Sequence, residues 1–284
     1  MKNIYLDQLE ETLTSLIKEL PTDGSLQESA SYMLFNQGKR IRPSIIVAIL
    51  DDLKLLNQQH FALALSVEIL HTASLIHDDL PALDNDDYRR GKLSCHKKYS
   101  ESQAVLLGDY SHAWAFQIAS LNASPEHLQE IIQVLAAVYQ SVCLGQILDM
   151  NQGVRPDFCL INKLKTAALF AGSFQIAGIA GNLNQAQVEK MQQLGEDFGL
   201  IFQLINDFKD SFLSPESTGR KESSDFKNNK QTAISHFETA REAKIFLEEQ
   251  IFTWNKSFEL VKQDFNNQLV NLSKVVDSVL LSVH

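Results

Sequence analysis

Along most of the chain, apolar residues recur at steps of three and four, the spacing that places them on one face of an α-helix. Within residues 61–79, for example, Leu63, Val67 and Leu70 follow this spacing. The pattern predicts helices over residues 1–20, 26–36, 44–56, 61–79, 103–121, 126–151, 160–181, 185–212 and 233–282. No run of useful length alternates between apolar and polar residues, so strands are not expected.

Few residues interrupt these helical patterns. Glycine and proline contribute 12 and 6 of the 284 residues, about half of their average share, which disfavours turn-rich sandwiches and propellers. No linker and no internal repeat divides the chain, and the long polar stretch at 213–232 is expected to be a loop or lid. The sequence therefore predicts an all-α fold in which residues 1–284 form a single-domain helical bundle.

Charge and composition exclude several classes of protein. The net charge of −10 argues against a protein that coats nucleic acid, and three cysteines are too few for a disulfide framework, which fits a cytoplasmic location. No signal peptide is recognisable at the N-terminus. Residues 131–148 and 166–188 lack charge, but glutamine, asparagine and glycine interrupt them. We expect fully buried helices there and no membrane span.

The most distinctive feature is a group of aspartates after the apolar helix over 61–79. Asp78 and Asp79 are followed by Asp84. Carboxylates so close together repel one another unless a cation lies between them, and an all-oxygen ligand set suits Mg²⁺. Asp78 and Asp84 would not share a face of an ideal helix, so Pro81 is expected to break the helix between them. A solvated acidic helix end is the alternative interpretation.

A second polar group lies on the helix predicted over 185–212. Gln203, Asp207 and Asp210 follow one another at steps of four and three among apolar neighbours, so they share one face. This face is a candidate second wall of the same metal site. Acidic pairs with this spacing are also common on helix surfaces.

Basic residues gather beside the acidic groups although the chain is acidic overall. Arg89 and Arg90 follow the first aspartates, Lys39 and Arg42 lie close together, and His71 precedes Asp78 by two helical turns. Further basic residues are Lys92, Lys97, Lys98, Arg220, Lys221, Lys227 and Lys230. A diphosphate requires such surroundings, with metal on one side and guanidinium donors on the other. Any one of these clusters could also be a solvated charge run, and His71 a core histidine.

Several of these segments resemble, in the same order, the motifs of the trans-isoprenyl diphosphate synthases. The resemblance runs from about residue 36 to 232 and rests on Gly38–Pro43, His71, Ser74–Pro81, Arg89–Lys92, Cys95–Tyr99, Gly108-Asp109, Gly145-Gln146 with Asp149, Lys165-Thr166 and Phe202-Gln203. The four residues between Asp79 and Asp84 resemble the bacterial short-chain branch, the farnesyl and geranylgeranyl diphosphate synthases.

The resemblance implies an isoprenoid synthase fold with a central substrate cavity, a homodimer and three Mg²⁺ ions. It implies that an allylic diphosphate ionises and that isopentenyl diphosphate attacks the resulting cation. The implied metal ligands are Asp78, Asp79, Asp84, Asp207 and Asp210. The implied contacts to the allylic diphosphate are Arg89, Lys165 and Lys230, and those to isopentenyl diphosphate are Lys39, Arg42, His71 and Arg90. Thr166 and Gln203 would turn oxygen dipoles toward the cation.

The chain departs from the family pattern at the second acidic motif. Asn206 replaces the usual first aspartate, and Lys209 adds a positive charge before Asp210. Both changes should weaken the third magnesium site and raise the magnesium requirement. The polar loop also lacks the usual glycine, which leaves open whether Arg220 or Lys221 contacts diphosphate.

The length of the product depends on the floor of the pocket before Asp78. Ala73 stands where bacterial farnesyl synthases tend to carry an aromatic residue, which favours a twenty-carbon product, whereas Tyr110, Trp114 or Phe116 could close the pocket at fifteen carbons. Two other functions use the same fold: a terpene cyclase, and a non-catalytic partner subunit of an active synthase. The four isopentenyl diphosphate contacts argue against the first, and the intact first aspartate motif argues against the second.

Overall fold

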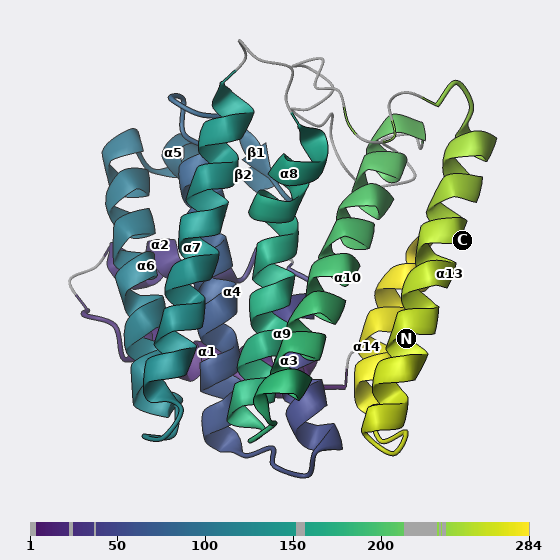
Figure 1. Ribbon diagram of the computed structural model, residues 1–284. Helices are drawn as coiled ribbons and strands as arrows, with labels where there is room; N and C mark the ends of the chain where they lie inside the picture. The colour runs from purple at the N-terminus through teal and green to yellow at the C-terminus, as the bar shows by residue number, and fades with distance from the viewer. Residues whose placement is uncertain are drawn as a thin grey trace.

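The long helices lie side by side and form a bundle (Figure 1). The computed structural model describes residues 4–22, 25–36, 38–151, 157–212, 232, 234 and 237–283. Five of the long helices are α4 (Gln58–Asp78), α6 (Glu101–Asn122), α7 (Leu128–Met150), α9 (Ala168–Ala180) and α10 (Gln185–Phe212), of which α4 and α10 carry candidate site residues. The others that pack around them are α1 (Leu6–Lys18), α2 (Leu26–Leu34), α3 (Ile41–Asp52), α13 (Ala240–Asp264) and α14 (Val270–Leu280). The predicted all-α fold is confirmed, and α10 has the predicted bounds.

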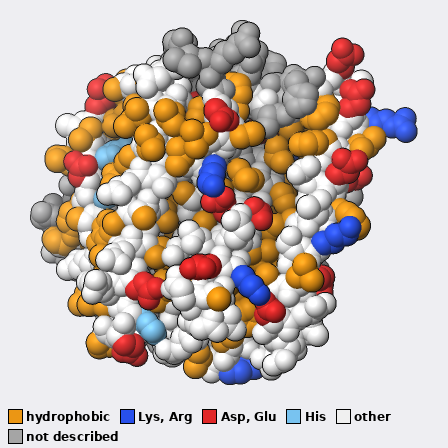
Figure 2. Space-filling view, viewed as in Figure 1, with side chains coloured by type: hydrophobic (Ala, Val, Ile, Leu, Met, Phe, Trp, Pro, Cys, Tyr) orange, Lys and Arg blue, Asp and Glu red, His pale blue; other side chains and the backbone are white. Residues whose placement is uncertain are grey.

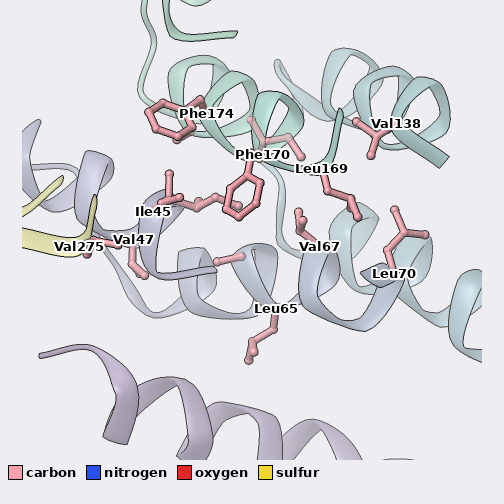
Figure 3. Packing of buried hydrophobic residues seen from close by; sticks show 14 of the residues in the cluster. Ile45, Val47, Leu65, Val67, Leu70, Val138, Leu169, Phe170, Phe174 and Val275 are labelled. Atoms are coloured by element: carbon pink, nitrogen blue, oxygen red, sulfur yellow. The ribbon is translucent and has the colours of Figure 1, made fainter. Parts of the chain in front are cut away.

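The core lies between α3, α4 and α9. Leu169 and Phe170 of α9 point toward Ile45 of α3 and Val67 of α4 (Figure 3). All four of these side chains are buried, and α3 is buried around almost its whole circumference, which explains why its sequence shows no polar face. Burial of such helices on all sides supplies the main hydrophobic stabilisation of the bundle.

The two uncharged stretches behave differently. Most of α9 is buried, as predicted, but the helix ends at Ala180, and residues 182 and 184–186 of the uncharged stretch 166–188 are exposed. The prediction of full burial is wrong for residues 131–148, because only 33% of the most apolar window of α7 is buried. By length and composition α7 could cross a membrane. Its exposed face carries Leu144, Ile147 and Met150, and the glutamines that interrupt its sequence did not indicate where this face lies.

The C-terminal segment at 233–282 contains a break that its apolar pattern did not reveal. Between α13 and α14 the backbone turns through Asn266 and Asn267, which have φ values of 51° and 60°, a conformation that asparagine tolerates better than most residues. The start of α14 is then held by Asp52, whose carboxylate accepts hydrogen bonds from the backbone N–H groups of Asn271 and Leu272, both at 2.9 Å. This cap fastens the last helix to α3.

Within the described residues, one short hairpin with two residues in each strand contradicts the expectation that the chain has no strands. Strands β1 (Tyr88–Arg89) and β2 (Lys92–Leu93) pair antiparallel. The turn between them consists of Arg90 and Gly91, with φ values of 53° and 79°, which is typical of a tight hairpin turn. Strands of two residues are too short to show an alternating pattern of apolar and polar residues.

Three short helices are α5 (Cys95–Lys98), α8 (Phe158–Asn162) and η2 (Leu281–Val283).

A π-helical turn, η1 (Lys163–Ala167), joins α8 to α9 without a break in the helix. Two glycines make room for it. A Cβ atom on Gly145 of α7 would lie 2.7 Å from Cγ of Lys165, and one on Gly199 of α10 would lie 2.5 Å from Cα of Ala167. This close packing of the backbone fixes the positions of the two side chains that η1 presents, Lys165 and Thr166. π-turns are rare in proteins, and those that occur often lie at functional sites.

We predict that Gly199→Ala destabilises the protein and Gly178→Ala does not. At Gly199 the added methyl group meets backbone, so η1 must move, and overpacking of this kind costs about 1–3 kcal/mol. At Gly178 on α9 the nearest atoms lie at 3.4 Å or more, and alanine is the better helix former. Urea unfolding of both variants would measure the difference, and equal stabilities would contradict the role of Gly199.

Candidate active site

The first acidic motif folds back on the end of α4. The helix ends at Asp78, and the chain beyond Pro81 returns so that the backbone N–H of Asp84 donates to the carbonyl oxygen of Asp78 at 2.9 Å. The N–H of Asp86 donates to the carbonyl oxygen of Asp79 at 3.2 Å. The predicted break at Pro81 is therefore present, and it brings the backbones of Asp78 and Asp84 together.

Arg89 compensates the buried carboxylate of Asp79. The Asp79 residue is completely buried, and its Oδ1 accepts a hydrogen bond from Nε of Arg89 at 2.9 Å and another from Nη2. The same Nη2 group lies 3.2 Å from Oδ2 of Asp86. Asp79, which was predicted to bind metal, is thus bound by a guanidinium. Arg89, which was predicted to bind diphosphate, is oriented by carboxylates.

The surroundings of these aspartates oppose their negative charge. The pKa of Asp78 is raised to about 6, chiefly by burial and also by the neighbouring Asp84, while Lys165 and Arg89 oppose the increase. Burial likewise raises the pKa of Asp79 to about 6, against the lowering effect of Arg89. Carboxylates held under such conditions are typical of functional sites, and a cation placed among them would relieve the cost of ionisation.

Lys165 extends from η1 toward the same acids. Its Nζ atom lies 2.7 Å from Oδ2 of Asp149 on α7, and its charge is the largest influence that lowers the pKa of Asp78. Both side chains of this ion pair are about four-fifths buried, at 21% and 17% exposure. The predicted diphosphate ligand Lys165 therefore lies beside the first acidic motif.

Thr166, the next residue, connects η1 to the second acidic motif. Its hydroxyl donates to Oε1 of Gln203 at 2.9 Å, and Nε2 of Gln203 donates to Oδ1 of Asp207 at 2.7 Å. Asp207 is buried, and Asp210 lies one turn further along α10, partly exposed. Of two consecutive residues of η1, Lys165 thus acts on Asp78 of the first acidic motif through its charge, and Thr166 is hydrogen-bonded to Gln203 of the second, although the two motifs are far apart in the sequence.

A cluster of basic residues includes Arg90 of the turn between β1 and β2. The guanidinium of Arg42 is buried and lies 4.3 Å from the ring centre of Phe170, and burial lowers its pKa to about 10. Nη1 of Arg90 lies 3.4 Å from the carbonyl oxygen of Asn36. Burial and the charges of Arg42 and Arg90 hold the pKa of His71 well below its usual range, so His71 is neutral at neutral pH. This arrangement can receive an anion.

Glu68 is a residue of this cluster that the motifs did not identify. Its side chain is buried at the centre of α4, its Oε1 lies 3.1 Å from Nη1 of Arg40, and its charge also acts on Arg42 and Arg90. Nε of Arg40 lies 2.8 Å from Oε1 of Glu10. A charged residue between Val67 and Ile69 in an apolar run was the signal in the sequence.

The remaining predicted residues have more peripheral places. Lys39 is exposed beside this cluster, and Asn206 is partly exposed on α10. Nζ of Lys209 donates to Oγ of Ser282 in η2 at 2.7 Å. Arg220, Lys221 and Lys230, from the segment predicted to be a loop, lie outside the described residues.

Most of the chain matches one known protein family. Residues 23–266 match the polyprenyl synthetase family. A farnesyl diphosphate synthase of Micrococcus luteus is 38% identical over 243 residues, which cover 83% of this chain and 82% of that protein. A chloroplastic geranylgeranyl pyrophosphate synthase of Catharanthus roseus is 35% identical over 73% of this chain and 61% of its own length.

A solved structure gives the same result for the fold. The geranyltransferase of Helicobacter pylori, complexed with magnesium and isoprenyl diphosphate, superimposes with a TM-score of 0.82 and 26% identity, covering 98% of this chain and 97% of that one. The resemblance noted in the sequence is confirmed, and so is the isoprenoid synthase fold that it implied. The chain belongs to the polyprenyl synthetase family.

Proposed function

We propose that this protein is a short-chain prenyltransferase that condenses isopentenyl diphosphate with dimethylallyl or geranyl diphosphate. The product is farnesyl or geranylgeranyl diphosphate, and diphosphate is released. The observation that carries the proposal is that Thr166 is hydrogen-bonded through Gln203 to Asp207, while the adjacent Lys165, paired with Asp149, lies close enough to Asp78 for its charge to lower the pKa of that carboxyl. Relatives named farnesyl and geranylgeranyl synthases support it.

Magnesium fits the acidic motifs. The donors are carboxylate oxygens, as Mg²⁺ prefers, and burial together with Asp84 opposes the negative charge of Asp78 in the absence of a cation. Asp78 and Asp84, assisted by Asp79, would hold two ions, and Asp207 with Asp210 would help to hold a third. When bound, magnesium neutralises the charge of the departing diphosphate.

The protein's own residues would divide the two substrates between them. Lys165 and Arg89, held by Asp149 and Asp79, would orient the allylic diphosphate, and Lys230 would join them from the polar loop. Thr166 and Gln203 would turn their oxygens toward the cation that develops when the carbon–oxygen bond breaks. The double bond of isopentenyl diphosphate then attacks this cation, and the released diphosphate is a suitable base for the proton that is lost.

The basic cluster would hold the second diphosphate. Arg42, His71 and Arg90 lie together there, with Lys39 exposed beside them. A neutral His71 can donate one hydrogen bond without adding charge. Separate anion sites for the two substrates distinguish a condensing enzyme from a cyclase, which needs one.

Asn206 leaves the third metal site with one fewer carboxylate than the family pattern. The ammonium of Lys209 is drawn toward Ser282. We therefore expect the metal to bind there through Asp207 and Asp210, with a raised magnesium requirement compared with relatives that have aspartate at this position.

The exposed faces of α6 and α7 support a homodimer. Hydrophobic side chains gather over these helices (Figure 2). The lining of a groove of about 630 Å³ between the two helices includes Phe116, Leu128 and Ile132. Exposed apolar patches of this kind mark protein interfaces. We propose that residues 1–284 form one domain, that two copies pair through this face, and that the enzyme is cytoplasmic.

The direct test is turnover by the purified protein. With magnesium, isopentenyl diphosphate and geranyl diphosphate we expect farnesyl or geranylgeranyl diphosphate and free diphosphate, measured by chromatography. Asp78→Asn should lower the rate by about a hundredfold or more, whereas Asp264→Asn, at a surface ion pair with Lys190, should leave it unchanged. Prenyl hydrocarbons formed without isopentenyl diphosphate would indicate a cyclase, and absence of turnover a partner subunit.

We predict that Glu68→Gln destabilises the protein by about 3 kcal/mol, because removal of one partner leaves buried arginine charge uncompensated. Glu10→Gln is the matched control. It also contacts Arg40, but its side chain is 32% exposed, so its loss should cost about 1 kcal/mol or less. Urea unfolding measures both values, and equal costs would contradict the central position of Glu68.

We predict that Ala73→Tyr shortens the main product. Ala73 is completely buried on α4, five residues before Asp78. Because the resemblance to the family assigns this position to the floor of the prenyl pocket, a phenol ring there should stop the growing tail earlier. Chromatography of products from geranyl diphosphate checks the outcome. An unchanged product length in a folded variant would show that the floor of the pocket lies elsewhere.

A further inference from the structure

Three potential metal ligands lie close together where the end of α4 packs against α6. His77 belongs to the last turn of α4, and Asp109 and His112 lie one turn apart on α6. One ligand atom from each can be chosen so that all three lie within 4.8 Å of one another. Nε2 of His77 is 3.7 Å from Oδ1 of Asp109, and the two imidazole ring centres are 5.3 Å apart.

Gly108 allows this approach. A Cβ atom there would lie 2.0 Å from Nε2 of His77, so the ring lies directly against the backbone of α6. In the present arrangement this nitrogen lies 3.1 Å from the carbonyl oxygen of Val105. This contact places the ring proton on Nε2, which donates to the carbonyl oxygen, so binding of a metal at Nε2 requires the ring to give up this hydrogen bond and carry its proton on Nδ1.

His112 supplies the second, independent observation. Its residue is 7% exposed, its Nδ1 lies 3.3 Å from the hydroxyl of Tyr139 on α7, and its Nε2 is buried without a hydrogen-bond partner. A buried polar atom without a partner is costly. Metal-binding histidines commonly have one ring nitrogen held by a neighbouring group while the other coordinates, and His112 has this arrangement.

The donor set differs from that of the acidic motifs. Two imidazole nitrogens and one carboxylate oxygen suit zinc and related transition metals rather than magnesium. Ligands about 2.0–2.1 Å from one tetrahedral zinc ion lie about 3.4 Å apart, close to the separation of His77 and Asp109. A protein site with three such ligands leaves the fourth position to water.

We propose that His77, Asp109 and His112 form a binding site for a transition-metal ion such as Zn²⁺, separate from the acidic motifs. Tyr139 is a positioning residue that orients His112. The site does not depend on the proposed prenyl transfer, because it rests only on these contacts.

The test is cobalt binding to the full-length, metal-free protein in excess magnesium, which keeps the acidic motifs occupied. Visible absorption of tetrahedral Co²⁺ reports the site, and Zn²⁺ should displace the signal. We expect one equivalent to bind, with affinity lowered at least about tenfold by Asp109→Asn and by His112→Gln. The side chain of Asp109 is 67% exposed, so the Asp109→Asn variant should fold even if the His112→Gln variant does not.

His127→Gln is the matched control, because His127 is hydrogen-bonded to Asn182 at 2.7 Å, away from the cluster. It should bind cobalt like the unmodified protein. Absence of a cobalt signal in the unmodified protein would overturn the proposal. Equal binding by the unmodified protein and Asp109→Asn would also overturn it, because the metal would then be held elsewhere.

Discussion

The arrangement of the site depends on how buried carboxylates are compensated by cations. Asp79 is buried completely and is matched by Arg89, and Lys165 is matched by Asp149. Such pairs gain little net stability, because each charge has lost its hydration. The effect of these pairs is to fix the orientation of the charged side chains. The guanidinium of Arg89 is held through two nitrogens, and the ammonium of Lys165 is held by Asp149, so both cations have few orientations left.

Much of the fold was predictable because helix periodicity is a local property. The bounds of α10, the break after Asp78 and the burial of α9 follow from apolar spacing, from Pro81 and from the lack of charge. The partners of Glu68 were not predictable, since Arg40 lies 28 residues away and no local pattern specifies a contact at that separation. The exposed face of α7 escaped prediction for a related reason, because an apolar surface for a neighbour has the same composition as a buried core.

The functional residues divide in the same way. The motifs located the acids, the arginines, Lys165 and Thr166, because each chemistry requires particular residue types in a short window. The way in which these groups meet was not in the motifs. The hydrogen-bonded series from Thr166 through Gln203 to Asp207 joins two segments that are distant in sequence, and the cluster of His77 with His112 requires the close packing of α4 on α6 at Gly108.

The π-turn η1 has a consequence for tolerance to change in this region. Such a turn accommodates one more residue than the same angular span of α-helix, so the flanking α8 and α9 keep their relative phase. Loss of a single residue between Lys163 and Ala167 would therefore convert η1 into regular α-helix without rotating α9. Lys165 and Thr166 could then no longer both keep the directions that take one to Asp149 and the other to Gln203, although no side chain in the core need change.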